Sequence, residues 1–259
     1  MELLLNSVHD LKYVVDVFSS IVSTITFQCS QTKLTISGVD PAHISLIQVD
    51  IDGTKVPRYL CEKNTTLTLY ASILQKILHT AKSNDQIMIY NKEDDIEHLI
   101  IILKSPERVQ TYEIPLLNDE SETVEASGMD YKVKFSVSSK TFNDSCSMFQ
   151  KLGCENIIFS NPNNSIIIKS TCDMCSTQTL LQCEENADQD TDTKCSLQFF
   201  DNEEEIDLQF SLAYIHIFSK LHAISNKVNI SLSQNFPILF QYEFSIGEAT
   251  FYVAPKIED

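Results

Sequence analysis

The chain has 259 residues and a formal net charge of −17 at pH 7, with 36 Asp and Glu against 19 Lys and Arg. This charge repels anionic partners at long range, so nucleic-acid binding requires positive charge gathered on one surface. Only five glycines occur and neither GxGxxG nor GxxxxGK[ST] is present, which argues against the common nucleotide-binding enzymes. No apolar run approaches the roughly 20 residues of a membrane span, and the N-terminus lacks a secretory signal, so we expect an intracellular protein away from membranes.

Apolar residues recur at helical spacing in four segments, and short strands bounded by turn residues follow each of them. In chain order we predict helix 11–22 with strands 24–29, 33–38 and 43–50, helix 70–83 with strands 86–90 and 98–104, helix 139–152 with strands 156–160 and 165–170, and helix 211–224 with strands 227–232 and 238–244.

The order of the predicted elements repeats along the chain. Residues 11–50 and 142–183 both run helix, strand, turn, strand, strand, and residues 72–103 match 213–244 in the same way. We therefore predict an α+β fold made of two copies of one unit, at 1–117 and 131–259. The acidic, apolar-poor segment 118–130 is the predicted connector.

Positive charge gathers in the predicted helices. They hold six lysines and two acidic residues, which leaves 13 of the 19 cations and 34 of the 36 anions for the rest of the chain. Lysine suits any solvated helix face, but these helices contain no Glu, which favours a basic surface that binds phosphates without sequence preference. The predicted DNA-facing residues are Lys12, Lys76, His79, Lys82, Lys140, Lys151, His216 and Lys220.

Three motifs carry a family resemblance. They are Val39-Asp-Pro-Ala-His43-Ile-Ser-Leu-Ile-Gln-Val, Tyr59-Leu-Cys61-Glu-Lys, and the ending Tyr252-Val-Ala-Pro-Lys-Ile-Glu-Asp259. Together with the repeat, the acidic connector and the basic helices, they resemble the proliferating cell nuclear antigen (PCNA) family from end to end. The terminal motif is the strongest of the three signals.

The resemblance implies a DNA sliding clamp. It implies a head-to-tail homotrimeric ring with inner helices and outer antiparallel sheets, which encircles double-stranded DNA and acts as a processivity factor. The expected partners are a DNA polymerase, a clamp loader and proteins with PIP-box-like peptides, in the nucleus or, for a viral protein, at a viral replication site. An enzymatic activity, a cofactor and a metal are not expected.

The resemblance also implies two sets of contact residues. A joint between subunits would pair strand 109–116 with strand 177–183 of a neighbour, and its residues are Val109, Tyr112, Phe149, Leu152, Gln178 and Leu180. The partner-peptide pocket carries over to Val39, His43, Ile44, Leu46, Val124, Ala126, Pro237, Tyr252, Ala254, Pro255 and Lys256.

Some positions depart from the family pattern. Residues that are basic in the family's central hole are here Tyr13, Ser19, His79, Asp144, Ser147 and Ala213. We therefore expect DNA contact that is weaker or more dependent on pH, because histidine loses its charge near neutral pH.

Two other functions remain open from the sequence. A subunit of a heterotrimeric DNA-damage checkpoint clamp would have the same fold. A hydrolase or metalloenzyme would use Cys172, Cys175 and Cys183, or His43 with Asp40. The single CxxC lacks a second ligand pair, so the metal site is the weaker alternative.

Overall fold

The computed structural model describes residues 1–92, 97–118, 129–162, 165–181, 196–199, 206–234 and 236–256. The chain forms two compact units, and each is described by itself below. The first unit comprises Met1–Val124 and Phe244–Ala249, and the second comprises Glu125–Glu243 and Thr250–Asp259. Most of the predicted connector, residues 119–128, lies outside the described residues.

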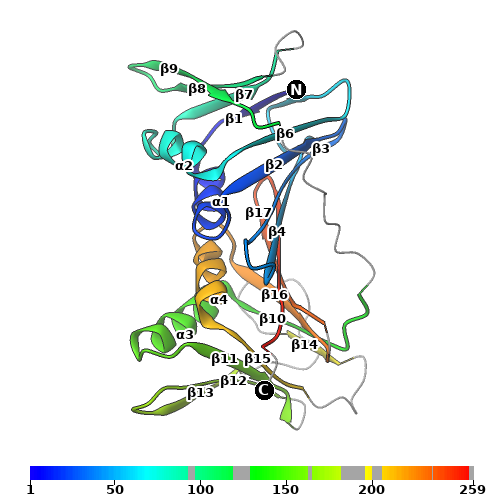
Figure 1. The fold of residues 1–259 in the computed structure, drawn as a ribbon, viewed down its shortest axis with the longest axis vertical. Helices are drawn as coiled ribbons and strands as arrows, with labels where there is room; N and C mark the ends of the chain where they lie inside the picture. Colours follow the sequence, from blue (N-terminus) through cyan, green and yellow to red (C-terminus); the bar gives the residue numbers. More distant parts are fainter. Residues whose placement is uncertain are drawn as a thin grey trace. The chain divides into compact units, whose positions relative to one another are not determined.

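The first unit contains two antiparallel sets of strands and two helices (Figure 1). One set has the order β5 (Arg58–Leu60), β1 (Glu2–Leu5), β7 (Gln86–Tyr90), β8 (His98–Lys104) and β9 (Val109–Pro115). The other has the order β4 (Ser45–Asp52), β3 (Lys33–Val39), β2 (Thr24–Cys29) and β6 (Thr65–Tyr70). Helices α1 (His9–Ser19) and α2 (Ala71–His79) pack against each other.

The second unit has the same composition of elements. One set of strands has the order β13 (Ser176–Leu181), β12 (Ile166–Thr171), β11 (Asn156–Ser160) and β15 (Asp207–Ser211). The other has the order β14 (Ser196–Phe199), β10 (Val133–Ser138), β16 (Lys227–Leu232), β17 (Ile238–Phe244) and β18 (Gly247–Val253), of which residues 250–253 belong to this unit. Helix α3 (Ser139–Lys151) packs against α4 (Leu212–Ser219).

A strand, a helix and three strands follow one another four times along the chain. The four runs are β1-α1-β2-β3-β4, β6-α2-β7-β8-β9, β10-α3-β11-β12-β13 and β15-α4-β16-β17-β18, with β5 and β14 as additions. Each unit therefore consists of two such runs. The predicted α+β class with antiparallel sheets and repeated units is confirmed.

Each core follows from the apolar periodicity of its elements. In α1 the stripe of Leu11, Val14, Val15 and Phe18 is buried, as the helical spacing predicts. The core of the second unit is rich in aromatic rings, whose centroids are 5.6 Å apart for Phe142 and Phe240, 5.9 Å for Phe159 and Phe210, and 4.3 Å for Phe218 and Phe251. Such large side chains contribute most of the buried apolar area.

Several predicted boundaries were wrong. The fourth helix ends as an α-helix at Ser219, and Lys220–Ala223 forms a 3-10 turn, as is common at helix ends. The second helix ends at His79, so Lys82 lies beyond it, in a turn where the Lys82 N–H donates to the Asp85 carboxylate at 3.0 Å. The predicted strand 43–50 begins only at Ser45, because His43 has a φ of 56°, outside the strand region.

Candidate functional site

Strands β9 and β13 are the last described strands of their sheets, one in each unit. A strand in this position has one ladder partner and exposes its remaining backbone N–H and C=O groups along the free side. These are the two strands that the sequence assigned to a subunit joint, with bounds that agree to within one residue where residues are described.

The alternation of the β12–β13 ladder identifies which backbone groups of β13 point outward. The Cys172 N–H donates to the Cys175 carbonyl at 2.9 Å, so this pair is hydrogen-bonded. In an antiparallel ladder hydrogen-bonded and non-hydrogen-bonded pairs alternate. Gln178 opposite Lys169 and Leu180 opposite Ile167 are therefore non-hydrogen-bonded pairs, and the N–H and C=O groups of Gln178 and Leu180 point away from β12.

Strand β9 has the same arrangement. The Ser105 N–H donates to the Arg108 carbonyl at 2.9 Å, and the register continues as Lys104 opposite Val109. By the same alternation the backbone groups of Val109, Thr111 and Glu113 point away from β8. Both edges therefore present outward N–H and C=O groups at every second residue.

Three of the predicted joint residues expose large apolar side chains. Val109 is 63% exposed, Leu180 is 55% exposed and Leu152 is 43% exposed, which is high for large apolar residues. Tyr112 is half-buried, and its hydroxyl lies 3.0 Å from Thr80 Oγ1. Phe149 is fully buried inside its own unit, so it has no exposed surface to offer a neighbour.

In the first unit one of the predicted DNA-facing residues contacts an acidic side chain. Lys76 and His79 are exposed on α2, and Nε2 of His79 lies 2.6 Å from Oδ1 of Asp16 on α1. The same oxygen accepts a hydrogen bond of 2.9 Å from Gln75. The contact links the two helices and offsets the charge of His79 whenever that side chain is protonated. Lys12 is half-buried and Lys82 is exposed.

In the second unit the matching contact between the helices is uncharged. Nε2 of His216 lies 3.3 Å from the hydroxyl of Ser147. Burial lowers the pKa of His216 below its ordinary value of about 6.5, and the nearby Lys220 charge lowers it further. His216 is therefore neutral near pH 7, and the cations on this side are the exposed Lys140, Lys151 and Lys220.

The loop that carries the first part of the predicted peptide pocket is held by Asp40. This side chain is only 2% exposed, and its carboxylate accepts hydrogen bonds from the backbone N–H groups of Ala42 and Ser45. The bonds fix the loop so that Ile44 remains 37% exposed while Leu46 is buried. Asp40, a member of the first family motif and a candidate of the alternative enzyme, therefore makes structural contacts here.

The second part of the predicted pocket lies in the C-terminal segment of the second unit. The Lys256 N–H donates to the Gln209 carbonyl at 2.7 Å, and the Lys256 ammonium donates to the side-chain oxygen of Asn156. These contacts hold the segment with Ala254 and Pro255 against β15 and β11. Val124 and Ala126 of the predicted pocket lie outside the described residues.

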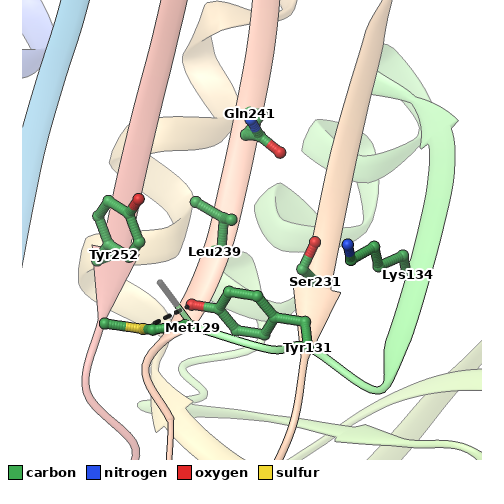
Figure 2. A pocket seen from close by; sticks show the side chains of 7 residues that line it. All are labelled: Met129, Tyr131, Lys134, Ser231, Leu239, Gln241 and Tyr252. Carbon is green, nitrogen blue, oxygen red and sulfur yellow. Dashed lines mark hydrogen bonds between the residues drawn. The ribbon is translucent and has the colours of Figure 1, made fainter. Parts of the chain in front are cut away.

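A pocket of about 190 Å³ lies within the second unit, beside Tyr252 (Figure 2). Its lining residues are Met129, Tyr131, Lys134, Ser231, Leu239, Gln241 and Tyr252. On β17, Leu239 and Gln241 alternate with Phe240, which packs on Phe142 of α3. The pocket therefore lies on the side of the sheet facing away from the helices.

Tyr131 is a member of this pocket that sequence reasoning missed. It is 4% exposed, and its hydroxyl donates to the Pro237 carbonyl at 2.9 Å. Burial raises the pKa of Tyr131 and the neighbouring Tyr252 raises it further, so the hydroxyl stays a donor. This bond ties the start of β10 to Pro237, one of the predicted pocket residues. An isolated tyrosine in a polar segment gave no signal for this role.

The cysteine and histidine residues of the alternative enzyme do not form a metal site among the residues that the structure describes. No group of three or more His, Cys, Asp or Glu side chains is placed there to hold a metal ion, and Cys183 lies outside this part. Within the same residues no helix has both the length and the apolar character to cross a membrane.

Comparison with known proteins agrees with this architecture. The family model for the PCNA N-terminal domain matches residues 1–123, and the model for the PCNA C-terminal domain matches residues 125–257. A proliferating cell nuclear antigen from Caenorhabditis elegans is 24% identical over 252 residues, which cover 96% of this chain and 94% of that protein.

The fold and these matches define the protein as a DNA sliding clamp, and they do not favour the checkpoint-clamp alternative. The two family models together cover all but a few residues of the chain. The chain belongs to the proliferating cell nuclear antigen family.

Proposed function

We propose that three copies of the chain join head to tail in a closed ring around duplex DNA, with β9 of one copy beside β13 of the next. Family membership supports a multimeric ring on DNA that serves a polymerase and other partners as a non-enzymatic scaffold. It also supports a nuclear location.

The observation that carries the ring is a pair of strand edges, on β9 and β13, that have no ladder partner among the described residues. Each copy offers outward backbone groups at Val109, Thr111 and Glu113 on one strand and at Gln178 and Leu180 on the other. Because the two edges differ, their contact is heterologous, and such contacts continue from copy to copy until the assembly closes. Closure removes every free edge of this kind.

Within the ring the lysines of the four helices would contact DNA phosphates. Phosphate contacts give binding that lacks sequence preference and weakens as salt rises. Neutral His216 and paired His79 contribute little positive charge near pH 7, so direct affinity for DNA is low and retention depends on ring closure.

Partner proteins would bind through PIP-box-like peptides, and the clamp loader and a DNA polymerase are the expected carriers. The proposed contacts in the first unit are Val39, His43, Ile44 and Leu46. Those in the second unit are Pro237, Tyr252, Ala254, Pro255 and Lys256, to which we add Tyr131 and Leu239 because they line the pocket beside Tyr252. We propose that residues 118–130, with Val124 and Ala126, connect the two units and take part in this binding.

Light scattering of the purified protein tests the ring. Wild-type protein should have three times the chain mass of 29.4 kDa. Leu180→Pro should yield monomers, because proline removes an outward N–H while the β12–β13 ladder keeps its own hydrogen bonds. Leu180→Ala is the matched control: it removes the side chain but keeps the N–H. A wild-type monomer at micromolar concentration, or a trimeric Leu180→Pro variant, would refute the proposed joint.

A further inference from the structure

The turn between β12 and β13 carries two thiols that belong to none of the surfaces described so far. Cys172 directly follows β12 and Cys175 directly precedes β13, with Asp173 and Met174 between them. Cys172 is half-buried, Cys175 is exposed, and Met174 is 92% exposed. Solutes therefore have access to this turn.

The two sulfur atoms are positioned to form a disulfide. They lie 3.6 Å apart, and the backbone hydrogen bond from Cys172 to Cys175 makes these residues a directly opposed pair. Opposed residues of a hydrogen-bonded pair have Cα atoms about 5.5 Å apart, which lies inside the range of about 4.4–6.8 Å that disulfides require. Closing the bond brings the sulfurs to the bonded distance of about 2.05 Å.

The two thiols differ in their ease of ionisation. Hydrogen bonds from the backbone N–H groups of Met174 and Cys175 lower the pKa of Cys172, and the Cys175 side chain lowers it further. The pKa of Cys175 is raised, chiefly by its hydrogen bond to Cys172. Cys172 is thus the better nucleophile, and Cys175 is placed to attack it once it is oxidised. By contrast, burial raises the pKa of Cys146 in the core to about 12.

We propose that Cys172 and Cys175 form a reversible dithiol–disulfide pair whose oxidant is a hydroperoxide. The Cys172 thiolate attacks one peroxide oxygen, an S–O bond forms as the O–O bond breaks, and the leaving oxygen takes up a proton as water or alcohol. Cys175 then attacks the Cys172 sulfenic acid, so that the S–S bond forms and water leaves with the Cys175 proton. The two sulfurs lose two electrons in total, which the peroxide gains.

An external thiol reduces the disulfide by thiol–disulfide exchange. A thiolate attacks one sulfur of the disulfide, and a second thiol releases the mixed disulfide, so both cysteines return to the reduced state. The oxidised form fastens the β12–β13 hairpin at its tip, next to the first residues of the free edge. The chemistry of the pair does not depend on the proposed ring, so the two proposals fail separately.

Among the described residues, Cys154 is a competing thiol near this turn. It is 7% exposed, and it lowers the pKa of Cys172 and raises that of Cys175, which places it near both. A disulfide between Cys154 and either Cys172 or Cys175 would carry the same mass change as the proposed one. Peptide mapping is therefore needed to assign the bond.

The experiment treats the full-length, folded protein with hydrogen peroxide and maps its peptides by mass spectrometry. The peptide that contains both Cys172 and Cys175 should be lighter by two hydrogen atoms, with the new bond between these two sulfurs. Dithiothreitol should restore the original mass. Sulfoxide at Met174 adds an oxygen atom instead, so the two products are distinguishable. The modification of Cys172 should be at least about tenfold faster than that of the buried Cys146, because the thiolate is the reactive form.

Two variants locate the steps. In Cys175→Ser the Cys172 sulfenic acid should persist and be trapped by dimedone, whereas Cys154→Ser should form the disulfide at the wild-type rate. Three results would overturn the proposal: a bond from Cys172 to Cys154 instead, equal reactivity of Cys172 and Cys146, or stoichiometric zinc on the purified protein that protects both thiols.

Discussion

The Asp16 carboxylate on α1 lies 2.6 Å from Nε2 of His79 on α2 and also accepts a hydrogen bond from Gln75. The second unit joins its helices without an acid, through Ser147 with His216 and through a bond of 3.0 Å from the Ser219 hydroxyl to Asn143. In the second unit the exposed Asp144 lies on α3 with Lys140 and Lys151, whereas in the first unit the Asp16 carboxylate directly contacts the proposed DNA-facing His79. Asp16 opposes phosphate binding both by its own charge and by pairing with His79.

Replacing Asp16 by Asn should strengthen DNA binding. The amide keeps the size of the side chain and a hydrogen-bonding oxygen but removes the charge. Affinity for a labelled duplex at low salt should rise by about twofold to fivefold, the range that one surface charge interaction supports. Fluorescence anisotropy measures it, with Glu243→Gln on the exposed part of β17 as the control.

If Asp16→Asn bound DNA no more tightly than Glu243→Gln, Asp16 would not face the DNA. A general effect of net charge would instead appear equally in both variants, since each removes one negative charge.

His216 should make the protein less stable in mild acid. Its folded pKa is lowered by burial and by Lys220, so below about pH 6.5 the unfolded chain takes up a proton that the folded chain does not. Stability is therefore lost as pH falls from the unfolded pKa toward the folded one. Between about pH 7.5 and pH 5, the urea concentration at the unfolding midpoint should fall less for His216→Gln than for the wild type. His222→Gln is the control, and its midpoint should fall as much as that of the wild type. An equal fall of the midpoint in His216→Gln and the wild type would show that His216 is not the source of the acid sensitivity.

The sequence was sufficient for the elements with strong periodicity. Strands such as β2 and β7 were predicted with the bounds that the structure has, because each alternates or runs apolar between clear turns. Short strands such as β1 (Glu2–Leu5) and β5 (Arg58–Leu60) were missed, since three or four residues carry no period of their own. Their conformation depends on pairing with each other.

The site residues that were missed act through contacts between distant parts of the chain. Asp16 and His79 are 63 positions apart, and Tyr131 reaches Pro237 across 106 positions. No local pattern encodes such a contact. The structural role of Asp40 could have been predicted from the sequence. An Asp that precedes Pro and Ala typically accepts hydrogen bonds from nearby backbone N–H groups.

Reversing three exposed lysines should separate DNA contact from assembly. Lys76, Lys151 and Lys220 are exposed, on α2, at the end of α3 and directly after α4. Changing all three to Glu should reduce DNA-dependent stimulation of a polymerase by about tenfold or more, since each lost phosphate contact weakens binding and each new carboxylate repels DNA. Light scattering should show an unchanged mass.

The matched control reverses three exposed lysines outside the helices, Lys55, Lys63 and Lys104, and so makes the same change in net charge. This variant should stimulate the polymerase as the wild type does. Equal impairment in both triple variants would mean that bulk charge, rather than the helix face, controls the effect.

Peptide binding should depend on exposed apolar side chains that contribute little to folding. Ile44 is 37% exposed although it is a large apolar residue, and Asp40 fixes the loop around it. Burial of such a side chain under an aromatic anchor gains about 25 cal/mol per Å² removed from water. Ile44→Ser should therefore weaken a Gln-x-x-aliphatic-x-x-Phe-Phe peptide by about tenfold. Ala254→Asp should weaken it as well, because it adds a charge that must lose its water on binding.

Calorimetry with the peptide measures both effects, and the melting temperatures should stay close to that of the wild type because Ile44 and Ala254 are only partly buried. Leu60→Ser is the control, since Leu60 is 48% exposed on β5 and belongs to none of the proposed contacts. It should bind the peptide with wild-type affinity. Unchanged affinity in both Ile44→Ser and Ala254→Asp would place the peptide on another surface. A matching loss in Leu60→Ser would mean that exposed apolar area in general, and not these residues, determines binding.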